Sequence, residues 1–156
     1  MNEFIQLMAA LFGSLGFAMI FNIHGKKLIW AAFGGFYVWA IYLLWQHIFG
    51  SNDYISAFAA SSLLTLYAEL MARWHKTPVT VFLVSGSIPL IPGASLYRTM
   101  NWLMGNHTLL FRRDSIYTIL FATSMAAGIT ATTLIFRMIW GIIIRHHLRH
   151  HPERLR

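Results

Sequence analysis

Apolar stretches of about 20 residues, separated by short loops that hold most of the charges, run along this sequence. Charged residues make up only 11% of the chain, whereas a soluble domain carries about 25%. So few charges do not cover the surface of a protein in water, and apolar stretches of this length cross a bilayer as helices. We therefore predict an all-α integral membrane protein with one membrane domain, 1–156, in contact with the lipid bilayer. The five predicted spans cover residues 4–23, 28–49, 54–72, 79–104 and 115–144, followed by a basic tail over 145–156.

The distribution of basic residues predicts how the chain is oriented in the membrane. One set of alternate loops, together with the tail, holds Lys26, Lys27, Arg73, Lys76, Arg145, Arg149, Arg154 and Arg156. The opposite set holds only Arg112 and Arg113. Because basic loops stay in the cytoplasm, we predict an N-terminus outside and a C-terminus inside. Five spans satisfy that parity and four do not.

Composition and motifs exclude several classes of function. The formal net charge of +7 comes from loops and tail rather than from a basic face with aromatic residues, so we expect no nucleic-acid partner. No motif of a hydrolase, kinase or metalloprotease occurs, and we predict neither an enzyme nor a cofactor. The chain has no cysteine, which excludes thiolate metal sites. The histidine pairs 146–147 and 150–151 have only Glu153 as a nearby carboxylate, so we expect a solvated tail and no metal site.

The fourth predicted span is interrupted by two prolines, Pro89 and Pro92. Each proline removes a backbone donor and clashes with the preceding helical turn. We therefore predict two half-helices joined by an unwound segment over 87–93. Irregular backbone at membrane depth occurs where it is buried in protein or lines a cavity, and transporters bind ions and anionic groups at such breaks. The alternative is a kink that only bends a helix.

The region around this break supplies the candidate substrate-binding residues. They are Ser85, Ser87, Pro89, Pro92, Gly93, Tyr97, Arg98 and Asn101. Arg98 lies well inside an apolar stretch, and two interpretations stay open: a counter-charge for a carboxylate substrate, or a side chain that reaches the outer interface. Tyr97 and Asn101 are four residues apart, so a helix places them on one face.

Acidic residues near the spans have both structural and functional interpretations. Glu69 precedes Arg73 by four residues, which favours an ion pair at the cytoplasmic interface over a proton-coupling role. Asp53, or a neighbour, is expected to cap the third span, and Asp114 the fifth.

Three segments carry a resemblance to a known family. They are Gly-Phe-Ala-Met-Ile-Phe-Asn-Ile at 16–23, Ala-Glu-Leu-Met-Ala-Arg-Trp-His-Lys-Thr-Pro at 68–78, and Ile-Pro-Leu-Ile-Pro-Gly at 88–93 with Tyr97 beyond. In these the chain resembles the ThrE-type threonine/serine exporters, and more narrowly the small subunit of the split form, equivalent to the C-terminal five-helix half of the fused exporters. The resemblance implies a bacterial inner-membrane protein that exports threonine and serine, or dicarboxylates such as succinate. It also implies a larger five-helix partner subunit with a hydrophilic N-terminal domain.

Two functions follow as hypotheses. The first is half of a secondary transporter for small amino or organic acids, driven by proton exchange. The second is a non-transporting scaffold subunit that stabilises a partner membrane protein. The broken span and Arg98 favour transport, because a scaffold does not need unwound backbone. A small pump with dual topology is opposed by the charge bias.

Overall fold

The computed structural model describes residues 2–50 and 52–150, with side chains as far as Ile142. Over these residues every regular element is a helix, and no β-strand occurs. The prediction of an all-α chain is confirmed. In order, the elements are α1 (Glu3–Ile20), α2 (Lys26–Phe49), α3 (Asp53–Trp74), α4 (Thr80–Ser87), the 3-10 turn η1 (Ile88–Leu90), α5 (Gly93–Met104) and α6 (Thr108–His150).

The described part of the chain offers four or five membrane crossings. Four helical stretches are long and apolar enough to span a bilayer: α1, α2, α3 and Thr108–Ile142 of α6. α4 with η1 meets α5 at a bend of 55°, and this pair is a fifth crossing if the two pieces form one span. Five crossings and the orientation of the termini remain predictions.

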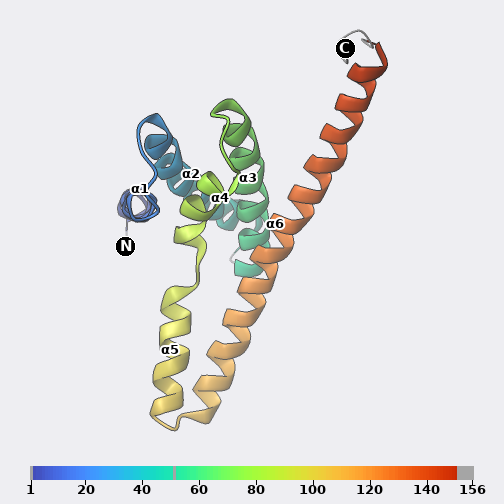
Figure 1. The fold of residues 1–156 in the computed structure, drawn as a ribbon. Coiled ribbons are helices and arrows are strands. Elements are labelled where there is room, and N and C mark those ends of the chain that lie inside the picture. Colours follow the sequence, from blue (N-terminus) through green and yellow to red (C-terminus); the bar gives the residue numbers. More distant parts are fainter. Residues whose placement is uncertain (1, 51, 151–156) are drawn as a thin grey trace.

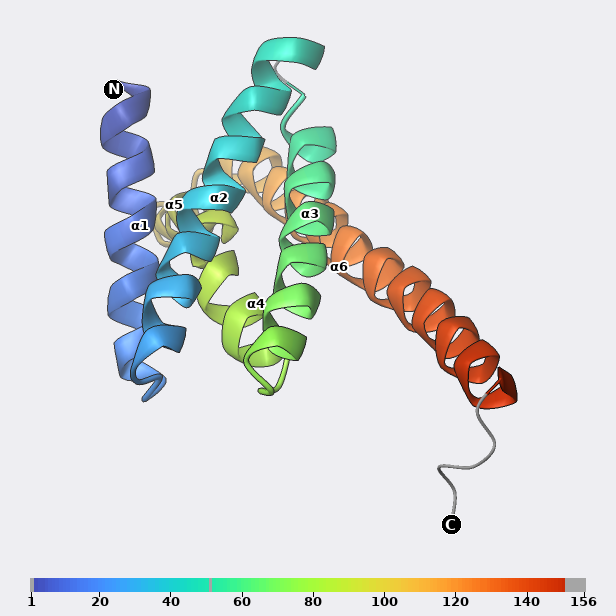
Figure 2. The same ribbon diagram turned by 90° about the horizontal axis from the view of Figure 1, so that it is seen from above.

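The helices form a group of four and a hairpin. α1, α2 and α3 run side by side in alternating directions, and α4 packs against both α2 and α3 (Figure 2). α5 leads away from this group. α6 returns alongside α5, crosses α3 and extends beyond the other helices (Figure 1). In Figure 2 the N-terminus and the α2–α3 turn lie at one end of the group. The α1–α2 and α3–α4 loops lie at the other end, as alternating spans require.

The start of α6 corrects one prediction. We expected Asp114 to cap this helix, but α6 begins at Thr108. Asn106 adopts a left-handed conformation with a φ of 54°, and the His107 N–H donates to the Trp102 carbonyl at 3.0 Å. These features close a short turn directly after α5, so the helix resumes earlier than the charged residues suggested. Asp114 therefore lies inside α6, well past its first turn.

Small residues set how closely the helices approach. Gly35 of α2 packs on Ser14 of α1, and a Cβ at Gly35 would lie 2.5 Å from the Ser14 Cβ. Gly128 of α6 packs on α3, and a Cβ there would lie 2.6 Å from the Phe58 carbonyl oxygen. Any larger residue at either position forces the two helices apart.

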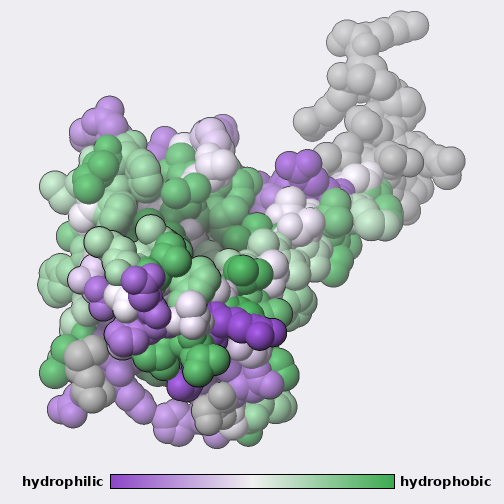
Figure 3. Space-filling view, turned by 90° about the horizontal axis from the view of Figure 1, so that it is seen from below, coloured by the Kyte–Doolittle hydropathy of each residue, from purple (hydrophilic) through white to green (hydrophobic). Residues whose placement is uncertain are grey.

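The outer surface of the molecule is largely apolar. Figure 3 shows hydrophobic side chains over most of the face seen from below, with hydrophilic groups gathered in small patches. Large exposed apolar side chains include Met104, Leu109 and Met138. A surface of this kind suits lipid rather than water, in agreement with the composition.

Candidate functional site

The chain between α4 and α5 is not α-helical. α4 ends at Ser87, one 3-10 turn follows, and Ile91 is extended with φ −62° and ψ 124°. The Gly93 N–H donates to the Ile91 carbonyl at 2.7 Å, and α5 then begins at Gly93 with no side-chain cap on Pro92. Both prolines lie in this interruption because neither can donate to a helical ladder.

A pocket of about 300 Å³ lies against this break. Part of its wall comes from the break and the start of α5: Pro89, Leu90, Ile91, Pro92, Gly93, Ala94, Ser95 and Arg98. The rest is aromatic and comes from other helices: Trp39 and Tyr42 of α2, and Tyr117 and Phe121 of α6. The proline segment, residues 88–92 between α4 and α5, therefore forms part of one wall of the pocket. Helices that are distant in sequence supply the other wall.

A second pocket, of about 440 Å³, also touches Pro89. Trp39 and Pro89 line both pockets, and α1 supplies most of the remaining wall of the second, including Gln6 and Gly13. The Trp39 indole N–H donates to the Gln6 side-chain oxygen at 3.2 Å. A movement of the proline segment would therefore change the shape of both pockets.

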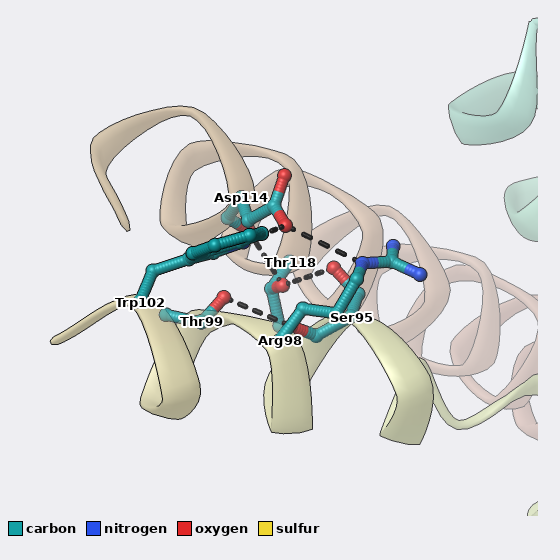
Figure 4. A network of polar contacts seen from close by, with 6 residues as sticks. All are labelled: Ser95, Arg98, Thr99, Trp102, Asp114 and Thr118. Atoms are coloured by element: carbon teal, nitrogen blue, oxygen red, sulfur yellow. Dashed lines mark hydrogen bonds and ion pairs between the residues drawn. The ribbon is translucent and has the colours of Figure 1, made fainter. Parts of the chain in front are cut away.

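Arg98 belongs to a network between α5 and α6 (Figure 4). Its Nε donates to Asp114 Oδ2 at 3.4 Å, and the Trp102 indole N–H donates to the same oxygen at 3.2 Å. Ser95 Oγ and Thr118 Oγ1 lie 2.7 Å apart across the two helices. The Arg98 side chain is 54% exposed, and in Figure 4 its two terminal nitrogens point away from Asp114. One edge of the guanidinium is therefore held and the other is presented outward.

The predicted site residues separate into two groups. Pro89, Pro92, Gly93 and Arg98 line the break pocket. The other four do not line it: Ser85, Ser87, Tyr97 and Asn101.

The hydroxyls of the two serines are occupied within their own helix. Ser85 Oγ donates to the Val81 carbonyl at 2.7 Å, and Ser87 Oγ donates to the Val84 carbonyl at 2.9 Å. Serine bonds of this kind are common in helices, and spacing along the chain does not reveal them. Tyr97, which is 73% exposed, points out from α5 instead.

Glu69 and Arg73 form the ion pair that their spacing indicates, with Arg73 Nη2 3.5 Å from Glu69 Oε2. The Glu69 residue is only 5% exposed, whereas the Arg73 side chain is 35% exposed, so the carboxylate end of the pair is buried. The position of the pair at the cytoplasmic interface remains a prediction. The Arg73 guanidinium lies 3.9 Å from the ring centre of Trp140 and 4.8 Å from that of Phe136. Arg73 therefore also attaches α3 to α6 by cation–π contact.

Asp53 is held in a way that the sequence did not indicate. Asn52, not Asp53, occupies the cap position of α3, and it makes no side-chain cap bond. Asp53 instead accepts hydrogen bonds from Tyr42 and Gln46 of α2, at 3.1 and 2.7 Å, and from Tyr117 of α6, at 2.7 Å.

This carboxylate is close to open space and to the break pocket. Asp53 and Tyr117 line a pocket of about 570 Å³ at the α2–α3 turn. Tyr42 and Tyr117 also line the break pocket. Two tyrosines thus connect the Asp53 carboxylate to the pocket at the proline break.

Metal ligands do not gather in the described residues, where no three histidine or acidic side chains come together as a candidate ion site. The side chains of the histidine pairs 146–147 and 150–151 lie outside the part that the structure describes.

The family model described as threonine/serine exporter, ThrE, matches residues 6–135. The matched range includes every residue that lines the break pocket, and it ends within α6. No solved structure matches the chain.

Proposed function

We propose that this chain, which belongs to the threonine/serine exporter family, ThrE, is half of a secondary transporter. Its substrate binds in the pocket at the proline break. The observation that carries this proposal is the pocket itself, where an uncapped helix start and Arg98 face aromatic walls. The transported molecule is a small amino acid that leaves the cytoplasm in exchange for protons across the bacterial inner membrane.

The α5 side of the pocket suits a carboxylate. The first turn of α5 begins at Gly93 with no side-chain cap, and helix starts carry a partial positive charge of roughly half a unit. Anions bind at such positions through the backbone N–H groups. Arg98 lies little more than one turn further along and presents its terminal nitrogens away from Asp114. A substrate carboxylate would be bound by the backbone and the guanidinium together.

The opposite wall suits an ammonium group rather than a second carboxylate. Trp39, Tyr42, Tyr117 and Phe121 present aromatic rings to the pocket. Ring faces attract cations and repel anions, because their π electrons carry negative charge. A zwitterionic amino acid satisfies both walls, whereas a dicarboxylate such as succinate places one carboxylate against the rings. The aromatic lining therefore favours threonine and serine over dicarboxylates.

A partner subunit completes the pathway in this proposal. Five crossings are few to enclose a route through the bilayer, and the break pocket has walls from α2, η1, α5 and α6 only. The exposed Tyr97 and Asn101 on α5 then face the larger subunit with the hydrophilic N-terminal domain. This division is consistent with transporters built from two related halves.

Export of labelled threonine from vesicles tests the proposal, with flux normalised to inserted protein and with the partner present. Arg98→Ala should lower export by about tenfold or more, because a charge-assisted hydrogen bond is lost. Arg98→Lys should lower it less, since a charge remains without the planar fork. Arg112→Ala is the matched control, because Arg112 is exposed on α6 and does not line the pocket.

A second arm of the same test removes the break. Pro89→Ala combined with Pro92→Ala allows the helix to close and should abolish export while insertion is retained. Wild-type flux in both this double variant and Arg98→Ala would reject the break pocket as the substrate site. It would favour the non-transporting scaffold instead.

A further inference from the structure

Asp53 is a carboxylate that three helices hold without a cation. It begins α3, and its three hydrogen-bond donors are the hydroxyls of Tyr42 and Tyr117 and the amide of Gln46. Among the described side chains, no lysine, arginine or histidine is within ion-pair distance of it. The described groups that hold this carboxylate are therefore all neutral hydrogen-bond donors.

The groups around Asp53 come from each helix packed against it. α2 contributes Tyr42 and Gln46, and α6 contributes Tyr117. On α3 itself, the Tyr54 ring packs on the Tyr117 ring with centres 5.7 Å apart. Arg98 is the charged group on the far side of Tyr117, across the break pocket. Of the described residues that line the pocket beside Asp53, none other is charged.

We propose that Asp53 is the residue that takes up and releases the proton during transport, and that its protonation state sets the positions of Tyr42 and Tyr117 in the wall of the break pocket. This inference rests on the proposed function. The ionised carboxylate accepts all three donors, whereas a protonated acid must donate one hydrogen bond of its own. The side-chain amide of Gln46 donates to Asp53, so on protonation a tyrosine hydroxyl must turn or move.

The movement has a direct route to the substrate. Tyr117 links Asp53 to the break pocket and belongs to α6, the helix that also carries Asp114, the partner of Arg98. When Tyr117 loses its bond to Asp53, the contact between α3 and α6 weakens at this end. The aromatic wall opposite Arg98 then changes, and the substrate site is loosened. The proton itself arrives through the pocket of about 570 Å³ beside Asp53 and returns to water when the carboxylate ionises again.

Two assays on the full complex in liposomes separate this inference from the proposed function. One is export of labelled threonine driven by a pH gradient, and the other is threonine–threonine counterflow at equal pH, which needs no net proton movement. Asp53→Asn should retain counterflow within about twofold and lose pH-driven export by about tenfold or more. Glu3→Gln is the control, because Glu3 is an exposed acid of α1, and it should leave both assays unchanged.

The outcomes are distinct. Absence of counterflow in the wild-type complex would defeat the proposed function, with Asp53 playing no part in that result. If Asp53→Asn keeps both counterflow and pH-driven export at wild-type rates, the assignment of Asp53 as the proton-carrying residue is wrong.

Tyr117→Phe gives an independent test if Asp53→Asn does not insert. It removes one donor to the ionised carboxylate and keeps the ring, so the pH at half-maximal export should rise by about one unit. An unchanged pH profile in Tyr117→Phe would contradict the inference.

Discussion

α3 carries two carboxylates, one at each end, and they are stabilised in opposite ways. Glu69 is paired with Arg73 of the same helix at 3.5 Å. Asp53 has no ion-pair partner among the described side chains and depends on hydrogen bonds from α2 and α6. The first arrangement forms whenever α3 is helical, and the second forms only when three helices meet.

This difference separates a structural charge from a responsive one. The Glu69 charge keeps its partner when α6 moves, because Arg73 is one turn away on α3 itself. Any shift of α6 changes the hydrogen bonds of Asp53, because Tyr117 moves with that helix. By the same reasoning a proton on Asp53 acts on α6, whereas a proton on Glu69 acts mainly on Arg73.

The largest effect should come from removing the cation beside Glu69. Arg73→Gln leaves a buried carboxylate unpaired and also removes the contacts with Trp140 and Phe136, so we expect a loss of about 3 kcal/mol or more in stability. Thermal unfolding in detergent measures it. Arg137→Gln is the control, because Arg137 is an exposed arginine of α6, the helix that carries Trp140 and Phe136. Equal melting temperatures for the two variants would mean that the pair contributes nothing.

A wedge between the two ends of α3 should have an intermediate effect. Gly128→Ala places a Cβ 2.6 Å from the Phe58 carbonyl oxygen, so α6 must move away from α3 at a cost of about 1–3 kcal/mol. We expect lower thermal stability together with an altered pH profile of export, because Tyr117 moves with α6. Gly141→Ala on the same helix meets nothing within 4 Å and should be neutral. An unchanged pH profile in a destabilised Gly128→Ala would show that the contact between α3 and α6 does not affect Asp53.

The smallest effect should come from neutralising Glu69. Glu69→Gln keeps the shape of the side chain and a hydrogen-bond acceptor for Arg73, which is partly exposed and still contacts two aromatic rings. We expect a change of about 1 kcal/mol in stability, because a neutral hydrogen bond replaces a charge-assisted one, and no change in the pH dependence of threonine export. Loss of pH-driven export at normal abundance would reverse the comparison and make Glu69 the coupling acid.

Several features of the site could be predicted from local spacing. Two prolines three residues apart predicted an interruption over 87–93, and α4 and α5 are separated there by the 3-10 turn η1 and two further residues. That the two helices form one broken span remains a prediction. A four-residue separation indicated the pair of Glu69 and Arg73. The same kind of reasoning was wrong about Asp114, because an aspartate before an apolar run resembles a cap, whereas here the helix had already begun at Thr108.

The aromatic half of the break pocket could not be predicted in this way. Trp39, Tyr42, Tyr117 and Phe121 are ordinary residues of apolar helices, and nothing in their spacing indicates a common pocket. α2 is rich in aromatic residues, which was a weak signal that this helix faces more than lipid.

The sequence by itself determined that this protein is helical and suited to a membrane, where it is interrupted, and which charges pair within one helix. Each of these depends on residues within a few positions of one another, and hydrophobic length and helical period act over that distance. Only the tertiary structure decided which tyrosines reach Asp53, that Arg98 meets Asp114, and that Glu69 is buried. Those outcomes depend on how the helices rotate and cross, which small residues such as Gly35 and Gly128 fix at contacts between distant segments.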